Sequence, residues 1–448
     1  MTRLPPSRSN SNAGLIIGLW LGLTLVAGIG IFALIYWAMG GFDAATPAPT
    51  ALPVAISTTV PPTAASVAQA TPSGSGGGGE TPAPACSYPP LPASGFGYGI
   101  QSHVFGGGPT ELFVGMIREK LGLYWVKMQV RWQDLEKTQG NIDWSTLDYA
   151  MQVACAKGVR VMLSVLAAPD WTHANPLPAP EGQEAPPDDY NLYANFVGQI
   201  VDRYPGQVGA IEVWNEANLE REWNTAAGIS AAEYVKLLQV SYAAIKSRDR
   251  TITVIAGAPS PTGVNLTSPE GRPIVVDDAT WLTQFVQAGG LAFADCMGTH
   301  SNGTNLPPTA DGAHPPGDGS GYTFKGPWDT PHYSWALKSQ VETYAAILNG
   351  QKPQCVTEFG YASAVDGKFP PIFGYAADVS EQLQADYLVQ AFNWMRDSGH
   401  VEMAFLFNLD YGPLGRDPSE DDNVIFSILN QNGSPRPAFD AIGAMPKP

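Results

Sequence analysis

The chain has 448 residues and a formal net charge of −17. The two bases and two acids of the first 90 residues cancel, so the whole negative charge belongs to the rest of the chain. A region this acidic repels phosphate backbones, which argues against nucleic acid as a partner and favours a neutral ligand over a polyanion.

The first element predicted along the chain is a membrane span. Residues 13–39 contain no charged side chain, and this stretch exceeds the ~20 residues that cross a hydrocarbon core. Arg3 and Arg8 precede it, and no base follows it for more than seventy residues. This asymmetry predicts a cytoplasmic tail at 1–13, a single-pass anchor at 14–39 and an extracellular remainder. A cleaved signal peptide is the alternative.

Residues 40–94 are rich in Pro, Thr, Ala and Gly. Such a composition cannot bury enough apolar surface to fold, so this segment is expected to be a linker. The folded domain is then expected at 95–448.

Apolar strands alternate with helical segments through the rest of the chain. The eight predicted strands lie at 96–102, 124–130, 159–166, 210–216, 252–258, 296–300, 355–360 and 401–408. Strands that are almost continuously apolar and alternate with helices indicate an α/β fold with a parallel sheet covered on both faces. Eight repeats favour closure into a (β/α)8 TIM barrel. An open doubly wound sheet is the alternative, although no G-x-G-x-x-G follows the first strand.

Two predicted strands end in glutamate. Glu216 ends the fourth strand and Glu358 lies near the end of the seventh. The carboxyl ends of barrel strands form the active site, so these side chains are expected to face each other across its mouth. Cleavage of a glycosidic bond needs one protonated and one ionised carboxyl group in different environments. The two glutamates therefore predict a glycoside hydrolase that needs no metal or organic cofactor.

The motifs around these glutamates resemble those of clan A glycoside hydrolases. The resemblance rests on Trp-Asn-Glu at 214–216, Thr-Glu-Phe-Gly at 357–360 and the segment 125–148. It is nearest to the β-xylosidase/α-L-iduronidase and cellulase-like families. It implies a retaining mechanism with Glu216 as acid/base and Glu358 as nucleophile. It further implies that Asn215 binds the sugar 2-hydroxyl. Arg131 is expected to orient the nucleophile, as a strand-two Arg does in relatives, and a surface ion pair is the alternative.

Two positions depart from the clan pattern. Asn302 stands where many members have a tyrosine that bonds the nucleophile, and the eighth strand lacks the usual terminal Trp. These departures leave the substrate open beyond an oligo- or polysaccharide. A catalytically inactive glycan-binding barrel at the cell surface and a purely structural surface protein are the alternatives.

Further polar and aromatic residues follow the predicted strands. His300 ends the sixth strand and His103 follows the first, and each is either a pocket residue or a core histidine. Aromatic faces stack on sugar C–H faces, but the same residues also serve as packing; the candidates are Trp132, Trp171, Trp223 and Tyr361. The loop at 301–333 is too long for a simple connection and is expected to shape the cleft.

The four cysteines show neither C-x-x-C spacing nor a histidine cluster, which argues against a zinc site. Cys296 and Cys355 open adjacent parallel strands, so their Cα atoms are expected ~5–6 Å apart, within reach of a disulfide. A pair of buried thiols is the alternative.

Overall fold

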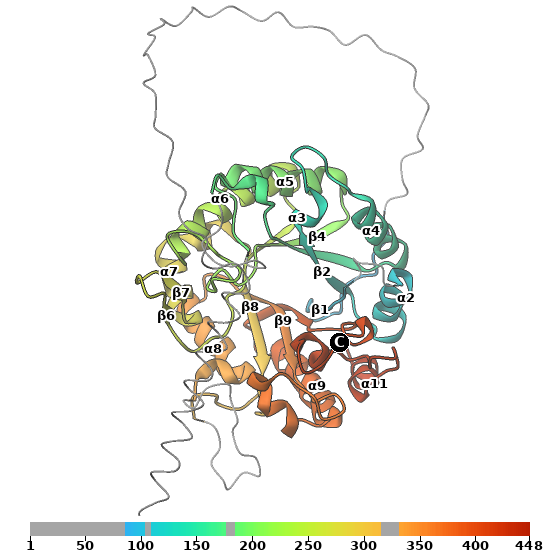
Figure 1. Cartoon of the computed structure of the whole chain (residues 1–448). Helices are drawn as coiled ribbons and strands as arrows, with labels where there is room; N and C mark the ends of the chain where they lie inside the picture. Colours follow the sequence, from blue (N-terminus) through green and yellow to red (C-terminus); the bar gives the residue numbers. More distant parts are fainter. Residues whose placement is uncertain (1–85, 104–108, 176–183, 315–330) are drawn as a thin grey trace, which may run out of the picture. The chain divides into compact units, whose positions relative to one another are not determined.

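The computed structural model of the chain describes residues 86–103, 109–175, 184–314 and 331–448. Eight parallel strands close into a barrel in the order β1-β10-β9-β8-β5-β4-β3-β2. Figure 1 shows these strands at the centre of a ring of helices. The strands are β1 (Gly97–Gln101), β2 (Trp125–Arg131), β3 (Arg160–Leu166), β4 (Val208–Val213), β5 (Thr253–Ala256), β8 (Cys296–Gly303), β9 (Gln354–Tyr361) and β10 (Val401–Leu406).

A helix follows each barrel strand. These helices are α2 (Thr110–Gly115), α4 (Ser145–Lys157), α5 (Tyr190–Arg203), α6 (Ala231–Arg248), α7 (Asp278–Gln287), α8 (Leu337–Leu348), α9 (Glu381–Asp397) and α11 (Pro437–Ala444). Several start at side-chain caps: Ser230 Oγ accepts from Glu233 N at 3.2 Å, and Ser380 Oγ accepts from Leu383 N at 3.1 Å. Such caps satisfy amide groups that have no partner within the helix. The (β/α)8 barrel predicted from the sequence is confirmed.

The interior of the barrel contains a small apolar layer separate from the larger core between strands and helices. Trp125, Ala210 and Phe405 belong to this layer, together with Cys296 and Cys355. The two cysteines form a disulfide between β8 and β9 with their Cα atoms 5.9 Å apart, as the strand starts suggested. This layer lies mainly toward the start of the strands, whereas the polar groups of the candidate site lie closer to their carboxyl ends.

A second disulfide joins Cys86 to Cys155 in α4. The sequence spacing gave no indication of this pair. Ser94 Oγ also donates a hydrogen bond to the carbonyl of Pro448 at the end of the chain. Residues 86–94, which composition assigns to the linker, therefore contact the barrel, so the folded unit begins earlier than expected.

The connection between β5 and α7 contains a short hairpin that the sequence did not predict. Its strands are β6 (Leu266–Thr267) and β7 (Pro273–Val275). Val275 bridges to Leu219, and Glu220 N donates to the carbonyl of Ile274 at 2.9 Å. The hairpin thus supports the loop that follows β4, where the first candidate catalytic residue lies.

The predicted anchor at 14–39 lies outside the described residues, as do the tail and most of the linker. Within the described ranges, no helix is both long enough and apolar enough to cross a membrane.

Candidate active site

Glu216 lies in a turn directly after β4. Trp214 and Glu216 both have positive φ angles, 68° and 38°, which are uncommon for residues other than glycine. Such conformations cost of order 1–3 kcal/mol and persist only where the surroundings impose them. Here Trp214 is fully buried and its Nε1 donates to the carbonyl of Glu222, while Glu216 N donates to the carbonyl of Ala258. These contacts fix the backbone that presents the Glu216 carboxyl group.

Glu358 lies in β9 next to a β-bulge. Between Val356 and Glu358, β9 advances two residues while β8 advances one, from Thr299 to His300. Because of this extra residue, the consecutive side chains of Thr357 and Glu358 both point into the barrel interior. Thr357 Oγ1 consequently donates to Glu212 at 2.7 Å, and Glu358 Oε1 accepts from Lys127 at the same distance.

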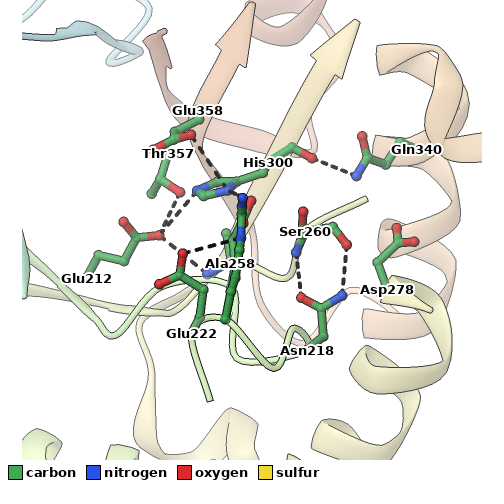
Figure 2. A network of polar contacts seen from close by, with 12 residues as sticks. Glu212, Asn218, Glu222, Ala258, Ser260, Asp278, His300, Gln340, Thr357 and Glu358 are labelled. Atoms are coloured by element: carbon green, nitrogen blue, oxygen red, sulfur yellow. Dashed lines mark hydrogen bonds and ion pairs between the residues drawn. The ribbon is translucent and has the colours of Figure 1, made fainter. Parts of the chain in front are cut away.

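His300 contacts both candidate catalytic glutamates. Its Nδ1 lies 3.0 Å from Glu216 Oε1 and 3.8 Å from Glu358 Oε2, and its side chain is buried. Figure 2 shows His300 beside Glu358, with its backbone carbonyl accepting from Gln340 at 2.7 Å. Burial alone would lower the pKa of His300, but the charge of Glu358 and the contact with Glu216 raise it above its usual value. His300 therefore lies between the two candidate catalytic glutamates.

Lys127 and Glu212 form a buried ion pair beneath Glu358. Lys127 Nζ lies 3.4 Å from Glu212 Oε2, and both side chains are fully buried. Burial would lower the pKa of Lys127, but the charges of Glu212 and Glu358 raise it above its ordinary value. Burial would likewise raise the pKa of Glu212, but Lys127 and His300 lower it. Lys127 and Glu212 are thus both charged near neutral pH, and the lysine lies between the carboxyl groups of Glu212 and Glu358.

Arg221 contacts the other oxygen of Glu216. Burial would raise the pKa of Glu216, but the Arg221 guanidinium and His300 hold it well below its usual range. The neighbouring Glu222 differs: burial and the charges of Glu184 and Glu216 raise its pKa to about 8. Glu216 is therefore ionised at neutral pH, whereas Glu222 is protonated.

Arg131 does not contact Glu358. Its guanidinium pairs with Glu184, and its Nε lies 3.3 Å from Asp134 Oδ2. Lys127, which lies earlier in β2, is beside the candidate nucleophile Glu358, in the place that the family resemblance assigned to Arg131. Arg131 instead lines a cavity of about 330 Å³.

This cavity lies at the ends of β1 and β2, and neither Glu216 nor Glu358 is in its wall. Its lining includes Gln101, His103, Gln129, Arg131 and Tyr411. His103 N donates to Asp410 Oδ1 at 2.8 Å, and the His103 ring packs on Tyr411. Burial and the charge of Glu358 raise the pKa of Tyr411, which is in the wall of this cavity.

Two asparagines have buried amide oxygens without a hydrogen-bond partner in the described part of the chain. They belong to Asn215, which precedes Glu216, and Asn302, at the end of β8. A buried acceptor without a donor costs free energy, and a ligand hydroxyl would satisfy it. Both residues are therefore suited to bind a sugar.

The predicted aromatic platforms are mainly core residues. Trp132, Trp223 and Tyr361 are each 1% exposed. Trp132 stacks on Phe196 and meets Trp171 edge-on, and Trp171 Nε1 donates to the carbonyl of Glu136 at 2.8 Å. Only Trp171 of the four is partly exposed. Side chains this buried cannot offer a ring face to a glycan, so packing accounts for the other three.

Among the described residues, one group has the spacing of a metal site: Asp277, Asp278 and His332. Asp277 Oδ2 caps α7 by accepting from Thr280 N at 3.1 Å, and Asp278 Oδ2 accepts from Tyr344 at 2.8 Å. His332 Nε2 lies 3.2 Å from Asp277 Oδ1. These contacts indicate that the three side chains stabilise the N-terminal end of α7.

Sequence reasoning missed Lys127, Glu212, Arg221 and Glu222. For the first two a signal exists: each is a charged residue in the middle of an otherwise apolar strand. Such a residue must find a partner inside the barrel, because an unpaired buried charge is costly. The loop at 217–224 offers no comparable signal, since its charged residues resemble those of any exposed turn.

No protein-family model matches the chain. A 90-residue stretch is 33% identical to a beta-xylosidase of Geobacillus stearothermophilus, but it covers only 18% of this chain and 17% of that enzyme. The barrel is similar to a family 39 glycoside hydrolase from Bacteroides cellulosilyticus, with a TM-score of 0.57 and 17% identity over 80% of this chain and 65% of that one. It is also similar to a monomeric beta-xylosidase from Caulobacter crescentus, with a TM-score of 0.53 and 18% identity over 80% and 69% of the two chains. In its fold, the chain is thus similar to clan A glycoside hydrolases.

Proposed function

We propose that this protein hydrolyses O-glycosidic bonds in a neutral oligo- or polysaccharide with retention of anomeric configuration. The main support is the position of His300. Its Nδ1 contacts both Glu216, which follows β4, and Glu358, which lies in β9. Two buried carboxyl groups on opposite sides of a barrel mouth are the groups this reaction requires.

The contacts of His300 limit the distance between the carboxyl groups. Glu216 Oε1 and Glu358 Oε2 cannot be farther apart than 3.0 Å plus 3.8 Å, which is 6.8 Å. Retaining enzymes hold their carboxyl groups ~5–5.5 Å apart, whereas inverting enzymes need ~6.5–9.5 Å to admit a water molecule. A limit of 6.8 Å between these two oxygens is compatible with the spacing of a retaining enzyme and supports the proposal.

In the first step, a carboxylate oxygen of Glu358 attacks the anomeric carbon. The bond to the leaving oxygen breaks, and Glu216 protonates that oxygen. In the second step, Glu216 removes a proton from water, which attacks the same carbon and releases Glu358 as a carboxylate. Asn215 accepts from or donates to the sugar 2-hydroxyl, a contact that tightens as positive charge develops on the ring.

The proposal is tested by screening the full-length chain, purified in detergent, against aryl glycosides and polysaccharides. β-Xylosides come first, because beta-xylosidases are among the similar proteins. Turnover with retained configuration, followed by NMR of the first-formed anomer, supports the proposal. Binding of glycans without turnover of any substrate would favour an inactive binding barrel instead.

The contact between Arg221 and Glu216 predicts how the activity depends on pH. Because Arg221 lowers the pKa of Glu216, a substrate must displace its guanidinium before Glu216 can act as an acid. The Arg221 side chain is 60% exposed, which permits this movement. In Arg221→Met the pKa of Glu216 rises, so the protonated form persists to higher pH. We expect the alkaline limb of kcat/KM to move up by about one pH unit.

Arg272→Met is the matched control, because Arg272 pairs with Glu220 on the same loop and does not contact Glu216. Its alkaline limb should match the wild type. An unmoved limb in Arg221→Met would show that Arg221 does not govern the protonation of Glu216.

We also propose that residues 14–39 anchor the enzyme in a membrane, with the barrel outside the cell. The support is the uncharged stretch at 13–39 with arginines only on its N-terminal side. After alkaline carbonate extraction, the full-length chain is expected in the membrane pellet and a variant lacking 14–39 in the soluble fraction. Release of intact full-length chain would contradict the anchor.

A further inference from the structure

The nucleophile candidate has a cationic partner that neither its motif nor the comparisons identify. Lys127 Nζ donates to Glu358 Oε1 at 2.7 Å and lies 3.4 Å from Glu212 Oε2. Lys127 and Glu212 are completely buried, and only 9% of the Glu358 side chain is exposed. A cation is thus enclosed between two carboxylates in the barrel interior.

Stability alone does not explain this cluster. Taking charged groups out of water costs several kcal/mol per ion, and buried ion pairs often stabilise a fold no better than apolar residues of the same size. The other inward positions at the neighbouring level hold apolar residues such as Trp125 and Met162. A lysine and a glutamate at the level of the nucleophile therefore indicate a role in the site.

Glu212 is itself held in place from two further strands. Its Oε1 accepts from Thr357 in β9 at 2.7 Å and from the amide of Ala258, which follows β5, at 3.4 Å. The bulge in β9 thus brings Thr357 to Glu212, as Figure 2 shows, and also brings Glu358 to Lys127. This arrangement fixes the lysine relative to the nucleophile.

We propose that Lys127, held by Glu212, positions Glu358 for attack, the role that the family resemblance assigns to Arg131. The inference rests on the proposed function and specifies its nucleophile site. Lys127 occupies Oε1, which leaves Oε2 of Glu358 for the anomeric carbon. Lys127 is not suited to form a Schiff base, because its two carboxylate partners keep it protonated.

Glu212 keeps the charge of Lys127 paired during the second step of the reaction. When Glu358 becomes a glycosyl ester it loses its charge, and Lys127 then remains paired with Glu212 alone. The buried cation is therefore compensated throughout the cycle. When the ester is hydrolysed, Lys127 stabilises the departing carboxylate.

The groups that face Glu358 come from several elements. They are Lys127 on β2, His300 on β8, Glu212 behind Lys127 on β4, Glu216 beyond His300, and Tyr411 after β10. Lys127 is the nearest cation among them. Its removal should therefore weaken the electrostatic stabilisation of the Glu358 carboxylate more than any other single change.

The test uses the double variant Lys127→Met/Glu212→Gln in the full-length chain. It removes one positive and one negative charge together, so no uncompensated charge remains between them. Without its cation at 2.7 Å, the negative charge of Glu358 loses its nearest electrostatic partner. We expect the acid limb of kcat/KM to move up by about one pH unit or more, with about tenfold lower kcat/KM one unit below that limb.

Two further variants complete the test. Glu212→Gln keeps Lys127 on Glu358 and removes a competing anion, so its acid limb should stay in place or move to lower pH. Lys157→Met, which breaks an exposed pair with Glu119, should leave the profile unchanged.

An upward shift in Glu212→Gln, or an unmoved acid limb in a folded double variant, would overturn the inference. If the double variant does not fold, the direction of the Glu212→Gln shift decides. A wild-type chain that cleaves no glycoside would instead refute the proposed function, so the two failures are distinguishable.

Discussion

Glu358→Ala is expected to abolish turnover of both natural glycans and activated aryl glycosides. Without the carboxylate no glycosyl-enzyme forms, and a good leaving group does not compensate for a missing nucleophile. We expect kcat to fall about 10⁴-fold or more, as it does when a group that acts as part of a catalytic unit is removed. Stopped assays with a dinitrophenyl glycoside, compared with the natural glycan, measure the loss on each substrate.

Azide distinguishes lost chemistry from lost structure in this variant. A small anion that fills the space of the Glu358 side chain should attack from the same side and give the glycosyl azide of inverted configuration. In the wild type, a mechanism-based fluorosugar should label Glu358, located by mass spectrometry of the digest. Labelling of Glu216 instead would show that the two roles are exchanged.

The fold could be predicted largely from pattern. All eight barrel strands lie within a few residues of the predicted ranges, because buried parallel strands must be apolar on both faces and helices must separate them. The hairpin β6–β7 was missed because Pro273–Val275 and Leu266–Thr267 are too short to show any periodicity. The Cys86–Cys155 pair was missed because Cys86 lies in a segment with the composition of a linker.

The site was harder to predict because its geometry depends on local irregularities of the strands. A regular β9 would send Thr357 and Glu358 to opposite faces, and only the bulge brings both into the barrel. Arg131 was expected beside the nucleophile, but inward positions alternate along β2, and Lys127 lies deeper in the barrel at the level of Glu358. The sequence shows which residues face inward but does not show their depth.

Burial also decided which aromatic residues could contact a ligand. Trp132 and Trp223 follow strands, where sugar-binding residues are common, yet neighbouring rings enclose both. Large aromatic side chains contribute as much to a core as to a binding surface, so sequence position alone does not separate the two uses.

Glu216→Ala should show the opposite dependence on the leaving group from Glu358→Ala. Natural glycans have poor leaving groups that need a proton, so loss of the general acid should cost about 10²–10⁴-fold in kcat/KM. A dinitrophenyl glycoside departs without a proton, so its glycosylation step should be far less affected. Hydrolysis of the glycosyl-enzyme then becomes slow, because no base activates water, and a burst of dinitrophenol should precede steady turnover.

Azide should relieve this second defect in Glu216→Ala, because an anion needs no general base. Its product should be the glycosyl azide of retained configuration, since Glu358 still forms the covalent intermediate. Glu220→Ala is the matched control: it removes a carboxylate from the same loop, paired with Arg272 and not with the site. Its kinetics should match the wild type on both substrates. Equal losses on the natural and activated substrates in Glu216→Ala, or an inverted azide product, would mean that Glu216 is not the acid/base.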